Sequence, residues 1–115
     1  GNVDRVHALA EGGARAVWES GVDGQCRRMT TTGLSWLGVQ LVDVLGNGWV
    51  NIILPAHREA VREAWDSAIA DRREFRMDYS WVSADGKEIP VHAHTYPLRN
   101  KLNEITGWIG IVDRR

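Results

Sequence analysis

The hydrophobic pattern of this chain changes its period once, between residues 71 and 75, and that change constrains the fold most. Over residues 55–71 apolar side chains recur every three or four positions, which is typical of an α-helix with one buried face. Over residues 75–81 they recur at every second position, which is typical of a strand with one buried face. The helical stripe comprises Val61, Ala64, Trp65, Ala68 and Ile69, and the alternating set comprises Phe75, Met77, Tyr79 and Trp81.

Two further strands are predicted after this alternating segment, because turn-forming residues separate two more apolar segments. The pair Asp85-Gly86 favours a tight hairpin, and residues 100–104 favour a second turn. We therefore expect strands over residues 88–98 and 105–113, which together with the preceding strand form an antiparallel meander.

The first half of the chain is predicted to complete the sheet. Residues 15–20 and 25–30 are two short strand candidates joined by an Asp-Gly turn. Residues 30–33 are poor element formers and are predicted to be a junction, while residues 34–54 are irregular with short helical pieces. The whole order predicts an α+β fold, in which helices cover one face of a five-stranded antiparallel sheet.

The residues before the first strand are predicted to form a separate cap. Residues 3–11 carry apolar side chains at helical spacing, and a Gly-Gly pair that follows them ends a helix. We therefore divide the chain into an N-terminal helix or cap over residues 1–14 and one domain over residues 15–115. The first two residues are candidates for a leftover tag.

Composition and charge exclude several functional classes. The 115 residues carry a formal net charge of -1 at pH 7, so no basic excess is present for nucleic-acid binding. No apolar run approaches the ~20 residues that span a membrane. The single cysteine, Cys26, can form neither an internal disulfide nor a cysteine-rich metal site. This indicates a reducing compartment and predicts a cytoplasmic location.

Several short strings, taken in order, resemble the PAS family. Residues 22–26 resemble its first hairpin, and Leu45-Gly46-Asn47-Gly48-Trp49 resembles the Leu-Gly-x-Gly-Trp segment of one bacterial sensory-box group. Residues 58–65 resemble the helix that follows the His-Pro-Asp-Asp motif of that group. The Gly-Trp-Ile-Gly run at residues 107–110 matches a feature that comes late in the sequence pattern of that group. The resemblance covers about residues 15–113 and implies the PAS fold.

The chain departs from the family pattern at three places. Leu54-Pro55-Ala56-His57 replaces the His-Pro-Asp-Asp motif, and Thr30 stands where an asparagine is usual. Pro90-Val91 replaces an Arg-Trp pair. These departures predict that a hydrogen-bond network of the family is altered in this chain.

The resemblance implies a non-catalytic sensory domain of a larger bacterial signalling protein. In the family, a strand end such as residues 111–115 leads into a connecting helix and an output domain, which is a histidine kinase or a diguanylate cyclase. We expect a homodimer, a covalently attached output domain, and either a small ligand or signal relay through dimerisation. The alternatives are a purely structural dimerisation module with a filled core and, third, a small α+β enzyme.

Two surfaces are candidates for function. The fold implies an interior space whose walls are predicted to include Trp36, Leu45, Trp49, Trp65, Ile69, Met77, Tyr79 and Val91. These side chains either hold a small, mostly apolar molecule or fill the space themselves. The opposite face of the sheet is a candidate interface formed by His92, His94, Tyr96 and Trp108.

The residue pattern argues against covalent flavin photochemistry and helix-ligated heme, and leaves any other ligand open. Cys26 follows a hairpin turn in a strand rather than lying in the reactive-cysteine string of flavin-binding relatives, and the long helix has no internal histidine. His92 and His94 lack nearby further ligands, so no metal site is predicted. No serine has a nucleophile-elbow context, and no catalytic residue is assigned.

Overall fold

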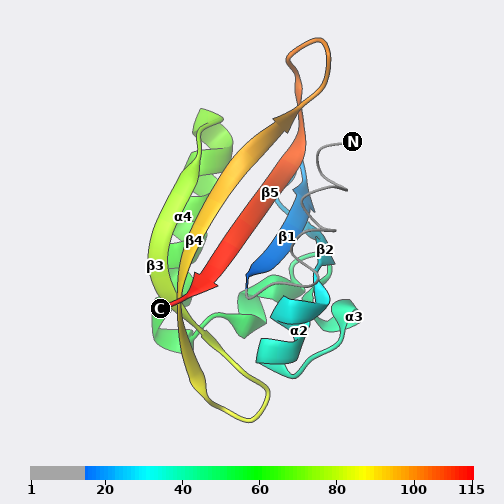
Figure 1. Cartoon of the computed structure of the whole chain (residues 1–115). Helices are drawn as coiled ribbons and strands as arrows, with labels where there is room; N and C mark the ends of the chain where they lie inside the picture. The colour runs from blue at the N-terminus through cyan, green and yellow to red at the C-terminus, as the bar shows by residue number, and fades with distance from the viewer. Residues whose placement is uncertain (1–14) are drawn as a thin grey trace.

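The chain folds into a five-stranded antiparallel sheet with helices on one face, in a computed structural model that describes residues 15–115 (Figure 1). The strands are β1 (Ala16–Gly21), β2 (Cys26–Met29), β3 (Phe75–Val82), β4 (Glu88–Arg99) and β5 (Ile105–Arg114). Their order is β2-β1-β5-β4-β3, so the last strand lies at the centre of the sheet. The predicted α+β class and meander are confirmed, whereas the helix predicted over residues 3–11 lies outside the described residues.

The helices pack against the face of the sheet that carries the apolar alternation. They are α2 (Thr31–Leu37), α3 (Leu41–Val44), the 3-10 helices η1 (Gly48–Ile52) and η2 (Pro55–His57), and α4 (Arg58–Asp71). Helix α4 lies along β3, while α2 contacts β1 and α3 contacts β2 (Figure 1). Within residues 15–115 no helix is long and apolar enough to cross a membrane.

Trp65, on the buried side of α4, is the centre of the core. Its indole makes edge-to-face contacts with three strands, at ring-centroid distances of 5.5 Å to Trp18, 5.6 Å to Phe75 and 5.4 Å to Trp108. This geometry places the positive ring edge against the negative face of its neighbour, which is favourable. One helical side chain therefore joins β1, β3 and β5 to the helix layer.

Trp108 lies on the helix-covered face, which corrects the prediction that it belongs to the opposite face. The register pairs Trp108 with Pro97 and Ile109 with Tyr96, so Ile109 is the residue that lies beside Tyr96 on the outer face. Side chains alternate along a strand, so an error of one residue exchanges the two faces. Trp108 is 1% exposed and belongs to the core.

Helix α2 begins within the segment that was expected to be an irregular junction. The Thr30 hydroxyl accepts a hydrogen bond from the Val17 N–H at 3.1 Å, and the Thr30 N–H donates to the Val17 carbonyl at 2.9 Å. A Cβ added to Gly33 would lie 3.0 Å from the Ala16 Cβ, so a larger residue would require the neighbouring side chains to shift. Tertiary packing therefore outweighs the weak helix propensity of these residues.

Candidate functional site

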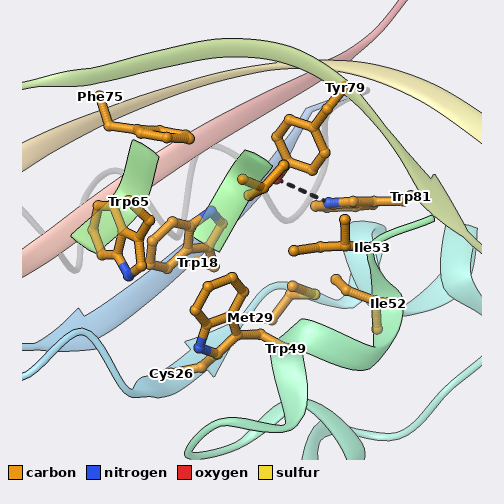
Figure 2. A pocket seen from close by; sticks show the side chains of 11 residues that line it. Trp18, Cys26, Met29, Trp49, Ile52, Ile53, Trp65, Phe75, Tyr79 and Trp81 are labelled. Atoms are coloured by element: carbon orange, nitrogen blue, oxygen red, sulfur yellow. Dashed lines mark hydrogen bonds between the residues drawn. The ribbon is translucent and has the colours of Figure 1, made fainter. Parts of the chain in front are cut away.

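A largely apolar cavity of about 30 Å³ lies between α4, η1 and the helix-covered face of the sheet. Its lining residues are Trp18, Cys26, Met29, Trp49, Ile52, Ile53, Val61, Trp65, Phe75, Tyr79 and Trp81. Figure 2 shows the aromatic rings of this set on several sides of the space. Because the lining comes from β1, β2, β3, α4 and the η1 segment, the cavity touches every layer of the domain.

Three of the residues predicted to line the cavity do so, namely Trp49, Trp65 and Tyr79. Leu45 lies instead at the surface and is 38% exposed. The physical reason is the orientation of α3, which directs Val44 into the core and leaves the next residue outside.

The remaining four predicted residues pack in or against the core without lining the cavity. Trp36 of α2 packs against Trp81, with ring centroids 6.2 Å apart. Val91 is fully buried in β4, and Met77 is partly buried in β3. Ile69 follows Trp65 by one helical turn and lines a different cavity.

Apart from Trp49, the walls contributed by β1, β2 and the η1 segment were not predicted from the sequence. Trp18 could have been recognised from alternation, because it lies opposite Met29 in the β1–β2 register and both side chains reach the cavity. Cys26 and Ile53 have no such local signal. Cys26 pairs with Ser20 after a shift in the β1–β2 register, which interrupts the alternation, and also forms an isolated bridge with Gly46. Ile53 is placed by an isolated bridge with Trp81.

The polar atoms around the cavity are few and protonated. Burial raises the pKa of the Tyr79 phenol to about 12 and the pKa of the Cys26 thiol to about 11. The Trp81 indole N–H donates to the Tyr79 hydroxyl at 3.3 Å, as the dashed line in Figure 2 shows. The indole N–H of Trp49 is buried and has no hydrogen-bond partner among the described residues. The cavity lining therefore carries no charge at neutral pH and includes one buried indole N–H without a partner.

The cavity does not fit a flavin or a heme. A volume of about 30 Å³ holds on the order of two water-sized molecules, whereas an apolar cavity that binds benzene measures about 150 Å³. The lining contains no asparagine or glutamine that would pair with the polar edge of a flavin ring, and no histidine that would ligate heme iron. The cavity can therefore enclose a very small apolar group beside its aromatic rings.

His57 connects the start of α4 to the strand that carries Tyr79. Its Nδ1 accepts a hydrogen bond from the Ser80 N–H at 3.0 Å, while the Leu54 N–H donates to the Ser80 carbonyl at 2.9 Å. Both backbone groups of Ser80 are thus used by the segment that replaces the His-Pro-Asp-Asp motif. This arrangement fixes β3 against the η2 segment at the edge of the cavity.

The outer face of the sheet holds the other predicted residues. The His94 ring stacks on Tyr96 with centroids 4.0 Å apart, and its Nδ1 lies 2.9 Å from the Tyr96 hydroxyl. His92 Nδ1 lies 2.6 Å from Asp78 Oδ1, which lowers the pKa of that carboxyl through the hydrogen bond. Beside these polar residues lies an apolar group made of Val17, Tyr96, Leu98, Ile109 and Ile111.

Within residues 15–115 no group of three or more histidine, cysteine or acidic side chains is placed to hold a metal ion.

Comparison with known proteins identifies relatives by sequence pattern and by fold. A family model described as the PAS fold matches residues 27–112. A comparison with curated protein sequences gives no significant match. Among solved structures, the PAS domain of a protein from Colwellia psychrerythraea superposes with a TM-score of 0.80 at 12% identity, covering 100% of this chain and 98% of that one.

Two other solved structures have the same fold. The N-terminal domain of a diguanylate cyclase with a PAS/PAC sensor from Marinobacter aquaeolei gives a TM-score of 0.77 at 15% identity, covering 87% of this chain and 94% of that one. A Light-Oxygen-Voltage domain studied with a flavin analogue gives 0.81 at 13% identity, covering 99% and 84%. At these identities the likeness concerns the fold alone.

Proposed function

The chain belongs to the PAS fold family, and we propose that it is a non-catalytic sensory domain of a larger bacterial signalling protein. The observation that carries this proposal is the apolar cavity, whose walls come from the sheet and from the helices that cover it. A molecule that binds only one arrangement of these walls shifts the population between arrangements. The cavity therefore offers a physical route from ligand binding to a change in the sheet.

We propose that the ligand is a small, mostly apolar molecule of a few non-hydrogen atoms. The volume of about 30 Å³ limits its size, and the apolar lining favours an uncharged molecule. The unpartnered indole N–H of Trp49 would pair with one hydrogen-bond acceptor on the ligand. A larger ligand requires movement of a wall. Trp49 is our candidate for this movement, because it is partly exposed and lies in η1, outside the sheet and α4.

Native mass spectrometry of protein purified without added ligand tests this proposal. The folded mass is compared with the denatured mass of the same sample. We expect an additional small mass on the folded form, or its appearance after exposure to a mixture of small apolar compounds. A folded mass equal to the denatured mass under all these conditions would contradict a ligand-binding role.

We also propose that the domain forms a homodimer through the outer face of the sheet. The support is the apolar group that includes Tyr96, Leu98 and Ile111, next to the partly exposed His92 and His94. Sedimentation velocity should show a dimer whose population falls for Tyr96→Glu. The control is Lys101→Glu in the exposed β4–β5 turn, which should leave the dimer unchanged. A wild-type chain that is monomeric at high micromolar concentration would refute this part.

A second candidate function is a structural dimerisation module with a filled core. One observation favours it: the eleven side chains around the cavity leave only about 30 Å³ between them. The absence of any thermal stabilisation by small apolar compounds would support this alternative over the sensory one.

For the whole protein we propose a cytoplasmic location and an attached histidine kinase or diguanylate cyclase domain. The fold similarity to the sensor domain of a diguanylate cyclase supports the second assignment, and the free, buried Cys26 supports a reducing compartment. Loss of signal-dependent output after deletion of this domain from the full-length protein would be the expected result.

A further inference from the structure

A second, larger cavity lies at the end of the domain where α4 stops. Its volume is about 340 Å³, within the usual range for small-molecule sites, and it shares no lining residue with the apolar cavity. Its walls come from the last turn of α4 and the residue after it, from the β1–β2 turn and from the β4–β5 hairpin. Figure 1 shows the end of α4 and this hairpin at the same end of the molecule.

Two arginines from distant parts of the chain line this second cavity. Arg72 follows α4, and its side chain makes no hydrogen bond or ion pair within residues 15–115. Arg99 ends β4 and uses one of its five N–H donors on the Asn103 carbonyl, at 2.9 Å. Glu104 is the one acidic residue of the lining, and its Oε1 accepts a hydrogen bond from the Asn100 side chain at 3.1 Å. The cavity therefore has an excess of unused cationic donors.

Apart from Asn103, the rest of the lining is apolar, and it includes a buried donor without a partner. Ile69 and Ile105 are partly buried, and Trp108 is 1% exposed. The indole N–H of Trp108 is buried and has no hydrogen-bond partner among the described residues. A buried polar group in this condition is unfavourable unless a ligand or water satisfies it.

The backbone at this cavity is left-handed at two non-glycine residues, of which the arginine is the unfavourable one. Arg72 has φ 56° and Asn103 has φ 63°, and within residues 15–115 these are the two non-glycine residues with positive φ. Glycine is the usual residue at the left-handed end of a helix, where arginine is less favourable. Strained residues are often retained where their side chains act on a ligand, which is consistent with a role for the Arg72 guanidinium here.

We propose that this cavity binds a small organic carboxylate with an apolar body. Arg72 and Arg99 present planar guanidinium groups, which suit a carboxylate, and Trp108 forms part of the wall beside them. The apolar body packs against Ile69 and Ile105. Inorganic phosphate would use the cations but not this apolar wall, so a carboxylate with a hydrophobic group fits the lining better. Such a ligand would fix the end of α4 to the β4–β5 hairpin, at a site separate from the apolar cavity.

Titration with phenylacetate, followed by the indole N–H signals in nitrogen-15 NMR spectra, tests this inference. We expect a saturable shift of the Trp108 indole signal with phenylacetate and no comparable shift with phenylacetamide, which lacks the charge. The Trp49 signal reports on the apolar cavity and should not move. The absence of binding at one cavity can therefore be distinguished from the absence of binding at the other.

Variants at the two arginines test which groups hold the ligand. The double variant Arg72→Gln and Arg99→Gln should raise the Kd for phenylacetate by about tenfold or more, because two charge-assisted contacts are lost. Replacing both arginines by lysine retains the charge and should lower affinity less. The control is Arg73→Gln, since the Arg73 side chain bonds to Asp71 and Ser67 away from the lining.

Three results would overturn the inference. The first is no shift of the Trp108 signal at millimolar phenylacetate. The second is an equal response to phenylacetamide or to inorganic phosphate. The third is an affinity that the double glutamine variant leaves unchanged while its spectrum shows a native fold.

Discussion

Replacing His57 by alanine should destabilise the domain, because it removes the acceptor of a buried backbone donor. Ser80 is 2% exposed, and its N–H donates to His57 Nδ1 at 3.0 Å. Without the imidazole this N–H has no acceptor. A buried donor left in this state costs about 1–3 kcal/mol in the free energy of unfolding. If water partly replaces the imidazole beside the Ser80 N–H, the loss of stability lies toward the lower end of this range. Urea unfolding followed by tryptophan fluorescence measures the difference.

His57→Asn is the matched control, because its side-chain oxygen occupies nearly the position of Nδ1 and also accepts a hydrogen bond. We expect this variant to retain most of the stability that alanine loses. The reasoning would be refuted if His57→Ala unfolds within about 0.5 kcal/mol of wild type, the range of ordinary surface substitutions. It would also be refuted if the asparagine variant were as unstable as the alanine variant.

Two further predictions concern the walls of the apolar cavity. Burial raises the pKa of Cys26 from 9.0 to about 11 and that of Tyr79 from 10.0 to about 12. The unfolded chain therefore loses these protons at lower pH than the folded chain. The free energy of unfolding should fall above pH 9 because of Cys26 and more steeply above pH 10 because of Tyr79, by up to about 1.4 kcal/mol per pH unit for each group. Urea unfolding from pH 8 to 11 measures this slope, and Cys26→Ala should flatten it near pH 9; an equal slope in that variant would show that the thiol is not responsible. Gly110→Ala would place a Cβ 2.4 Å from the Trp18 indole. Displacing that ring should cost about 1–3 kcal/mol and change the tryptophan emission spectrum, whereas an unchanged spectrum and stability would contradict the packing described.

The sheet and α4 could be predicted because their hydrophobic periods are long and regular. The alternation from Phe75 and the stripe on α4 each extend over several repeats, so the element type follows from them directly. Helix α2 could not be predicted in the same way. Its first residues have weak helix propensity, and the helix depends on the close approach of Gly33 to Ala16, which are distant in sequence.

The cavity could be predicted only in part, because its walls depend on contacts between distant segments. Trp65 and Tyr79 follow from periodicity, since each lies on the buried side of a regular element. Cys26 follows a shift in the β1–β2 register that interrupts the alternation, and Ile53 is placed by a single bridge to Trp81, so neither leaves a periodic signal. Trp108 was assigned to the wrong face because the register of β5 against β4 is set by pairing rather than by composition.

The central claim is that the cavity beneath α4 accepts a small apolar molecule, and xenon binding tests it most directly. Four of the six tryptophans line this cavity, namely Trp18, Trp49, Trp65 and Trp81. Under xenon pressure, nitrogen-15 NMR spectra should show saturable shifts of these four indole signals, while those of Trp36 and Trp108 change little. The variant Val61→Ile adds a methylene to the cavity wall and should weaken the response. Indole signals that do not respond, or six signals that shift equally and without saturation, would show that the core is filled and would contradict the claim.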